Sequence, residues 1–223
     1  MIDSIKETAE KIGFYEKLNN AEKEIILKNS ALVKYEKGQN VHSGNDECIG
    51  VMYIIKGALR IYIISDEGKE VTLYRLSDGE TCVMSASCLL QSITFDVIID
   101  AEEDTETLLI NSQVLKKIMK ENVLIENYVL NETVERFSSV MWTMQQILFM
   151  SMDKRLAIFL FDEIIKSGNN TVKMTHEQIA GYIGSAREVV SRMLKYFSEE
   201  GIVSVSRNGI EILDKKKLQK LTA

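Results

Sequence analysis

An α+β fold in three parts is predicted by three patterns that follow one another along the chain. Residues 32–111 contain many short runs of β-branched and aromatic residues between glycine turns, which is typical of a β-sandwich or jelly roll. Heptad spacing of apolar residues over 123–150 predicts one long helix. Two capped helical segments and a hairpin over 175–212 are the components of a winged helix-turn-helix. We therefore divide the chain into residues 1–120, 121–150 and 151–223.

Composition places the chain among ordinary soluble proteins. Of its 223 residues, 45% are hydrophobic and 27% are charged. No run approaches the roughly 18–20 apolar residues of a membrane span, and the acidic, amphipathic N-terminus lacks the features of a signal peptide. Three cysteines give no even disulfide framework and fit a reducing compartment. We expect a cytoplasmic protein with no membrane partner.

Charge is distributed unevenly along the chain. Residues 151–223 carry 12 Lys and Arg against 9 Asp and Glu, whereas residues 1–150 carry 15 against 24. The two parts therefore have net charges of +3 and −9, which together give the overall charge of −6. A polyanion would be attracted to the C-terminal part and repelled by the rest.

The first 120 residues are expected to begin with short helices, such as one at 21–29, and to continue as strands. The runs are short and evenly spaced, and glycines such as Gly57, Gly68 and Gly79 separate them. The expected strands are Val51–Ile55, Ala58–Ile64, Val71–Leu76, Phe95–Ala101 and Thr107–Asn111.

The long helix at 123–150 carries a seam with alternating spacings of four and three residues. We interpret this seam as the dimer contact of a parallel coiled coil, in which a buried amide at Asn127 could set the register. The alternative is a helix packed on its own domain. A further helix is expected at 153–167. The seam residues are Val123, Asn127, Leu130, Val134, Phe137, Met141, Met144 and Leu148.

Two capping signals predict the helix-turn-helix. Thr175 with Gln178 and Ser185 with Glu188 both have the spacing of a capping box, and Gly184 supplies a permissive turn between the two helices. The segments 202–206 and 210–212 flank Arg207-Asn208-Gly209, which predicts a hairpin with a type I′ turn.

The second of these helices has one packing face and one polar face. At 100° per residue, its apolar residues lie together, and Arg187, Glu188, Ser191 and Arg192 lie within 140° of one another on the other side. Arg pairs with guanine and Glu accepts from cytosine in the major groove. We therefore expect binding to double-stranded DNA; the alternative is a solvated surface helix.

The order of β-roll, long helix and winged helix-turn-helix resembles the Crp/Fnr family of bacterial transcription regulators. The run from Gly184 to Arg192 is similar to the family's recognition helix, and the run from His176 to Ala180 to the helix before it; Arg155-Leu156-Ala157 fits the R-L-A that opens the preceding helix. The resemblance implies base reading by Arg187, Glu188 and Arg192, and a cyclic-nucleotide-binding-like roll. The expected DNA-contacting residues are Thr175, His176, Ser185, Arg187, Glu188, Ser191, Arg192 and Arg207.

Despite this resemblance, we do not expect cyclic AMP to be the effector. Members that bind it carry an arginine in a phosphate cassette, whereas this chain has no arginine between Arg75 and Arg136. A buried phosphodiester would lack its strongest partner. Three cysteines also exclude an iron–sulfur cluster held by four cysteines of one chain.

The cofactor is left unknown, and several kinds of effector site stay open. Cys82 and Cys88 could form a thiol switch, could ligate haem or a metal together with Met84 or His42, or could simply be small buried residues; an unidentified small molecule is the remaining alternative. His42 is expected in a surface loop. The expected effector-pocket residues are Gly79, Glu80, Cys82, Met84, Ser85, Ser87 and Cys88.

The sequence thus predicts a homodimeric transcription regulator gated by a small molecule or a redox signal. The resemblance also implies RNA polymerase as a partner. The alternative is an effector-independent DNA-binding regulator with a degenerate roll. An enzyme on a cupin-like roll would need a His and carboxylate cluster, which a single histidine in the roll does not supply, and no catalytic or metal-ligating set is expected.

Overall fold

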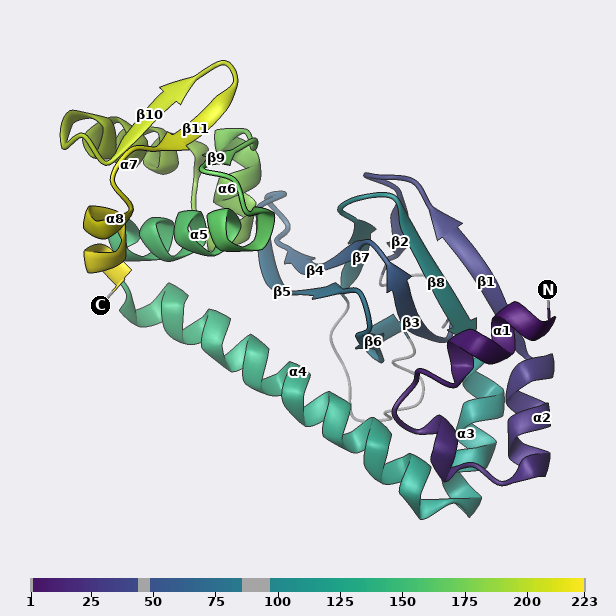
Figure 1. The fold of residues 1–223 in the computed structure, drawn as a ribbon. Coiled ribbons are helices and arrows are strands. Elements are labelled where there is room, and N and C mark those ends of the chain that lie inside the picture. Colours follow the sequence, from purple (N-terminus) through teal and green to yellow (C-terminus); the bar gives the residue numbers. More distant parts are fainter. Residues whose placement is uncertain (1, 44–48, 86–96, 223) are drawn as a thin grey trace. The chain divides into compact units, whose positions relative to one another are not determined.

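The computed structural model describes residues 2–43, 49–85 and 97–222 (Figure 1). Two compact units make up the chain. The first consists of Met1–Ile63 and Leu73–Val140, and the second of Ile64–Thr72 and Met141–Ala223. The boundary at residue 140 lies within the long helix.

Two four-stranded sheets form the roll. The first has the order β1-β8-β3-β6 and the second the order β2-β7-β4-β5. The strands of the first sheet are β1 (Ser30–Tyr35), β8 (Thr105–Ile110), β3 (Val51–Lys56) and β6 (Thr81–Cys82). Those of the second are β2 (Asn40–His42), β7 (Ile98–Ala101), β4 (Ala58–Ile64) and β5 (Glu70–Ser77). The jelly-roll prediction is confirmed, although three of the strands were not expected from the sequence: β1, β2 and β6.

Alternation of side chains explains why these segments pair as they do. In β4, Leu59 and Ile61 are fully buried and lie opposite Ala101 and Ile99 of β7. Gly57, with φ of +104°, precedes β4, and a Cβ there would lie 2.5 Å from Thr105 Oγ1. This close approach of two turns requires glycine.

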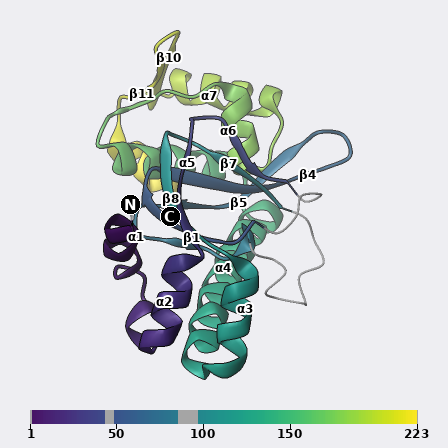
Figure 2. The same cartoon turned by 90° about the vertical axis from the view of Figure 1, so that its right-hand side faces the viewer.

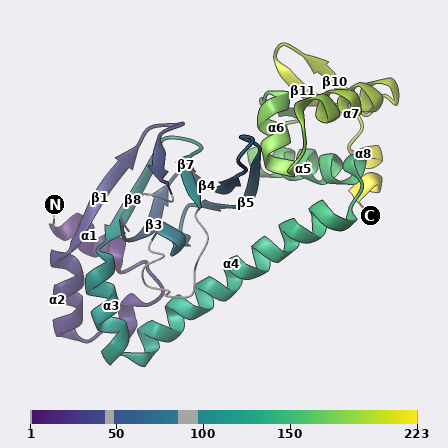
Figure 3. The same cartoon turned by 180° about the vertical axis from the view of Figure 1, so that it is seen from behind.

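Four helical segments cover one end of the roll (Figures 1 and 3). Ile5, Phe14 and Ile26 from three of them pack in one core with Leu108 and Ile110 of β8. The side chain of Asn111 caps the last of the four helices by accepting from Val114 N. The segments are α1 (Ile2–Ala9), the 3-10 turn η1 (Tyr15–Lys17), α2 (Asn20–Lys28) and α3 (Ser112–Glu121).

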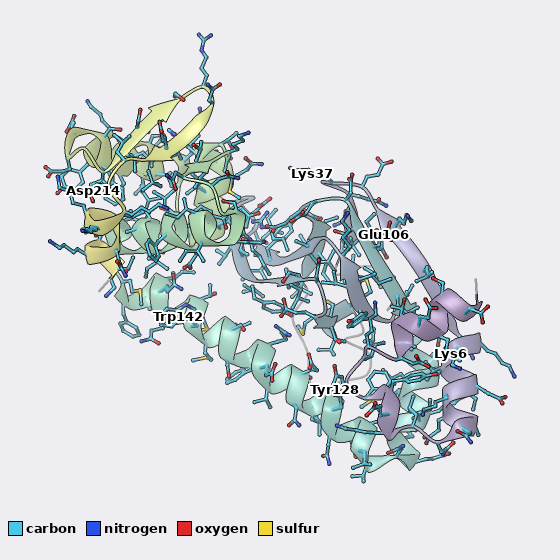
Figure 4. The ribbon with its side chains drawn as sticks, viewed as in Figure 1. Lys6, Lys37, Glu106, Tyr128, Trp142 and Asp214 are labelled. Atoms are coloured by element: carbon cyan, nitrogen blue, oxygen red, sulfur yellow. The ribbon has the colours of Figure 1, made fainter. Side chains whose placement is uncertain are left out.

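Helix α4 (Val123–Phe149) follows α3 after a break at Asn122 and confirms the predicted long helix. Ile125 and Val129 on one side are buried in the core of the first unit. Tyr128 lies on the same side, where its ring packs edge-on against Phe14 (Figure 4). One face of α4 therefore belongs to the roll.

The second unit contains the winged helix-turn-helix. Its core is formed by Leu156 and Leu160 of α5, Ile179 of α6, and Leu194 and Phe197 of α7. A three-stranded sheet of order β10-β11-β9 lies beside the helices, and the β10–β11 hairpin projects from them (Figure 2). The elements are α5 (Met152–Ser167), β9 (Thr171–Val172), α6 (His176–Ile183), α7 (Arg187–Glu199), β10 (Val203–Ser206), β11 (Gly209–Ile212) and α8 (Lys215–Thr222).

Candidate DNA interface and effector site

The first helix of the DNA-binding motif, α6, begins and ends as the sequence predicts. Thr175 Oγ1 accepts from Gln178 N at 3.1 Å, and the Gln178 side chain accepts from Thr175 N at 2.8 Å, which completes the capping box. Gly184 ends the helix in the left-handed conformation with φ of +62°. Ser185 N then donates to Ala180 O at 2.9 Å. This closing bond is that of a Schellman motif, which sets the sharp turn into the next helix.

The predicted capping box at Ser185 is wrong. The residue that caps α7 is Ala186, and no side chain caps this helix. Ser185 belongs to the end of α6, because its backbone N–H closes the Schellman turn, and its side chain is buried. Among the expected DNA contacts, Ser185 is therefore a buried residue of the turn rather than an exposed one.

The recognition helix α7 has the two faces that the sequence predicts. Val190, Leu194 and Phe197 are buried in the core of the second unit. Arg187, Glu188 and Arg192 are exposed, and Ser191 is half-buried. The two guanidiniums and the carboxylate are thus available to base edges and phosphates.

His176 on α6 and Ser191 on α7 are in direct contact. His176 Nδ1 lies 2.7 Å from Ser191 Oγ, and both side chains are half-buried. This pairing could not be predicted from the sequence, since the residues lie 15 positions apart on two helices.

The wing forms, but its turn differs from the predicted type. Ser206 pairs with Gly209, so Arg207 and Asn208 are the two central residues of the turn. A type I′ turn needs positive φ at both of them, whereas among the described residues only glycines have positive φ. Gly209 instead has the unusual φ of +123°, and a Cβ there would lie 2.5 Å from Val172 O, so both its backbone and its surroundings favour glycine. Arg207 is exposed at the tip.

Arg155 holds the turn before the recognition helix. Its Nη1 donates to Ile183 O at 2.9 Å, at the C-terminal end of α6, where a cation also suits the helix dipole. Burial lowers the pKa of the guanidinium. The sequence pointed to Arg155 through its R-L-A motif, without showing its partner.

In the part that the structure describes, the expected effector residues lie in the turn before β6, in β6 itself and just after it. Cys82 is a fully buried thiol, and burial raises its pKa even though Ser85 and Met84 donate hydrogen bonds to it. Met84 is buried, and Ser85 Oγ donates to Gly50 O at 2.7 Å. Ser87 and Cys88 lie outside the described residues.

The prediction that His42 lies in a surface loop is wrong. His42 ends β2, opposite Ile99 of β7, and is 5% exposed. Strand pairing with β7 turns its side chain into the roll. Its Nδ1 is buried and has no hydrogen-bond partner among the described residues.

A partly buried ion-pair cluster joins the turn before β6 to helix α4. Arg136 Nη1 donates to Glu80 Oε1 at 3.2 Å, and Nη2 lies 3.5 Å from Glu132 Oε2. Burial raises the pKa of Glu132, an effect that Arg136 opposes. Next to the cluster, Thr81 Oγ1 and Tyr128 Oη are 3.2 Å apart, and burial raises the pKa of Tyr128 to about 12. Sequence reasoning missed Arg136, which is distant in the chain from the Glu80 turn.

The seam on α4 is exposed along its whole length. Its apolar side chains are between 44% and 64% exposed, and Asn127 is exposed as well. Trp142, next to Met141 in the chain, is 49% exposed (Figure 4). This is a large apolar surface for a protein to leave in water.

The described part of the chain offers neither a membrane-spanning helix nor a metal-binding group. No helix there is both long and apolar enough to cross a membrane. No group of three His, Cys, Asp or Glu side chains there is arranged to hold a metal ion.

Comparisons with known proteins match both units. Residues 154–221 match the model of the Crp-like helix-turn-helix domain, and residues 32–122 match that of the cyclic nucleotide-binding domain. The global nitrogen regulator of Synechococcus elongatus is 24% identical over 190 residues, covering 81% of this chain and 85% of the relative. The c-di-GMP responsive global regulator of Xanthomonas campestris shares the fold, with 18% identity, a TM-score of 0.73, and coverage of 88% of this chain and 100% of that one.

A regulator from Eubacterium rectale is much more similar. Its solved structure, described as that of a transcriptional regulator of the Crp/Fnr family, is 45% identical in sequence and has a TM-score of 0.93. The match covers 96% of this chain and 99% of that one. The chain therefore belongs to the Crp/Fnr family of DNA-binding transcription regulators, with a cyclic-nucleotide-binding-like domain in front of its helix-turn-helix.

Proposed function

We propose that this regulator acts as a homodimer that joins through the α4 seam and places one recognition helix on each of two half-sites. The exposed apolar seam is the observation that carries the proposal. Seven apolar side chains, together with Asn127, follow alternating spacings of four and three residues, which fits a second copy of the same helix. The opposite face of α4 is already used, because Ile125 and Val129 pack in the roll.

The dimer explains how a module with few base-reading residues can select an operator. Arg187, Glu188 and Arg192 can read only a few base pairs in one major groove. Two copies related by a twofold axis read two half-sites about one helical turn, or a multiple of it, apart. The operator is then an inverted repeat, and its affinity depends on the dimer.

Gating by the roll is the second part of the proposal. The cluster of Arg136 with Glu80 and Glu132 ties the turn before β6 to the helix that carries the seam. Val134 and Phe137 of the seam stand within three residues of Arg136. An effector that alters the Glu80 turn can therefore shift α4, and so bias two arrangements of the dimer.

The burial of Cys82 argues against a thiol switch at this residue, and we therefore favour a small molecule as the effector. The reactive species in thiol oxidation is the thiolate, whereas burial disfavours the thiolate of Cys82. Variants Cys82→Ser and Cys88→Ser test the alternative directly. A switch that uses either thiol predicts loss of any oxidation-dependent change in DNA affinity in that variant.

An effector-independent regulator is the second candidate. It is favoured by the internal pairing of Arg136, whose guanidinium already has two carboxylate partners within the chain. The two candidates differ in whether operator affinity responds to small molecules of the cell.

Selection of duplexes from a randomised DNA pool by the purified full-length protein tests both parts. The proposal predicts enrichment of an inverted repeat with half-sites about one turn apart. Enrichment of a single unrepeated site, or of none, would contradict it. Repeating the selection with and without a small-molecule extract distinguishes a gated regulator, whose enrichment changes, from an effector-independent one.

A further inference from the structure

The contact between His176 and Ser191 has a chemical consequence for the DNA interface. A neutral imidazole has one nitrogen that donates and one that accepts. The partner of Nδ1 therefore decides which role remains for Nε2 on the other side of the ring. Here that partner is the Ser191 hydroxyl, 2.7 Å away.

The Ser191 hydroxyl differs from those of other helical serines in this chain. Hydroxyls of Ser138, Ser139 and Ser167 donate to the carbonyl four residues earlier in their helices, at 3.1, 3.2 and 2.7 Å. Ser191 makes no such bond to the described part of α7, and its hydrogen bond goes to His176. A hydroxyl that donates to Nδ1 leaves the ring proton on Nε2, whereas a hydroxyl that accepts from Nδ1 leaves it on Nδ1.

The outer nitrogen of His176, Nε2, is the ring atom that remains for a partner outside the chain. Nε2 makes no hydrogen bond to the described residues, and the ring is only half-buried. His176 is the first residue of α6, the helix that crosses the DNA backbone in this motif. The hydroxyl oxygen of its neighbour Thr175 accepts from Gln178 N in the capping box. The imidazole Nε2 is a further polar atom at this helix start that none of the described residues binds.

We propose that Ser191 is a positioning residue that acts through His176. Its hydroxyl donates to Nδ1, and the Nε2–H that results donates to a phosphate of the DNA backbone. Ser191 itself then touches neither a base nor a phosphate, in contrast to the expectation from its place on the recognition face. The inference rests on the DNA-binding role of the family and does not depend on the dimer or on the effector.

Substitutions of His176 separate the two nitrogens. All affinities are measured at pH 8, where imidazole side chains are neutral, on the selected duplex and on the unselected random pool. His176→Asn offers an atom near the place of Nδ1 but no outer donor, and we expect it to lose about three- to tenfold in affinity, as His176→Ala does. His176→Gln offers an amide nitrogen near the place of Nε2 and should retain most of the affinity.

The losses should be equal on both DNA samples, because phosphate contacts carry no sequence information. They should also leave the salt dependence unchanged, since a neutral donor displaces no counterion. A change in preferred bases with His176→Ala, or wild-type affinity of His176→Ala on both samples, would overturn the phosphate contact.

A double-mutant cycle tests the positioning role of Ser191. Ser191→Ala should weaken binding in the wild-type background and have no further effect in the His176→Ala or His176→Gln background. An equal loss in all three backgrounds, or an altered base preference, would show that Ser191 contacts DNA directly and would overturn the proposal. Ser198→Ala, a half-buried serine of the same helix, is the matched control.

Two controls distinguish these outcomes from a folding defect and from a failure of the proposed operator model. Thermal unfolding of each variant detects a folding defect, and the His176→Gln pair with and without Ser191→Ala decides the question where His176→Ala is unstable. If the wild-type protein selects no duplex, the proposed operator model fails, while the random pool at low salt still measures the phosphate contact.

Discussion

The two units of this regulator are specified over very different distances in the sequence. In the second unit, the helix-turn-helix is set by the Thr175–Gln178 capping box and by the bond from Ser185 N to Ala180 O, which join residues three and five positions apart. In the first unit, the decisive polar contacts join Glu80 to Arg136 and Thr81 to Tyr128, 56 and 47 positions apart. Local signals identify the DNA-binding motif, whereas the chemistry of the roll emerges only when the chain folds.

Residues of helix α4 belong to both units, and substitutions in its seam should have the largest effect. Phe137→Glu puts a charge at the centre of the proposed dimer contact, and we expect the dimer dissociation constant to rise by at least about a hundredfold. Sedimentation equilibrium measures this change. Phe137→Leu keeps the seam apolar and should remain close to wild type; equal behaviour of the two variants would remove Phe137 from the contact.

The locally specified recognition face gives the next largest effect. Arg187→Ala should cost about 1–3 kcal/mol at a specific site and relax one base position. Competition binding against single-base variants of the selected duplex measures both. Lys216→Ala on α8 removes an exposed cation of the same unit and should leave base preference intact. Unchanged affinity and specificity in Arg187→Ala would argue against Arg187 as a base reader.

Backbone geometry of the wing supplies a matched pair of glycines. Gly209 has φ of +123° and a backbone oxygen 2.5 Å from a built Cβ, whereas Gly201 has φ of +66° and open space around it. We expect Gly209→Ala to destabilise the second unit by about 1–3 kcal/mol, because strain and a backbone clash combine, and Gly201→Ala by about 1 kcal/mol. Thermal unfolding monitored by circular dichroism compares them. Equal losses would mean that the wing adapts to the added methyl group.

The smallest effect concerns the long-range cluster of the roll. Burial raises the pKa of Glu132, so the folded state holds its proton more tightly than the unfolded state does. Its contribution to stability is present at low pH and is lost as pH rises from about 4.3, the ordinary glutamate value, through the raised value.

Glu132→Gln abolishes this titration. The stability of the variant relative to wild type should therefore increase with pH across that window, by less than about 1 kcal/mol because the site is partly solvated. Urea unfolding at several pH values measures the trend, with Glu126→Gln, an exposed glutamate of the same helix, as control. A difference that does not vary with pH would mean that Glu132 has its ordinary titration.

The contrast between the two units also explains which elements and residues could be predicted from the sequence. The long helix and α6 were predicted to within one residue at most of their boundaries, because caps and heptads act over a few residues. The prediction of a cap at Ser185 was wrong, since the Schellman closure after Gly184 takes that residue into the turn. The prediction of an I′ turn was wrong because Arg207 and Asn208 do not adopt positive φ, and the unusual φ of the hairpin falls on Gly209.

The wrong and missed predictions for the roll have a different origin. His42 was placed in a loop because β2 is only three residues long, and its burial depends on pairing with β7, far along the chain. Arg136 was missed as a neighbour of the Glu80 turn because a search along the sequence for a nearby arginine cannot see a side chain supplied by a distant helix. The candidate DNA contacts followed from spacing within one motif, whereas the effector site requires the packed structure.

In the proposed dimer, the α4 seam pairs two copies so that two recognition helices engage one operator. Sedimentation equilibrium of the full-length protein, alone and mixed with the selected duplex, tests this pairing. We expect two chains in the free protein and two chains per duplex, with Phe137→Glu reduced to single chains in solution. A wild-type protein that remains a single chain, free and on DNA, would contradict it.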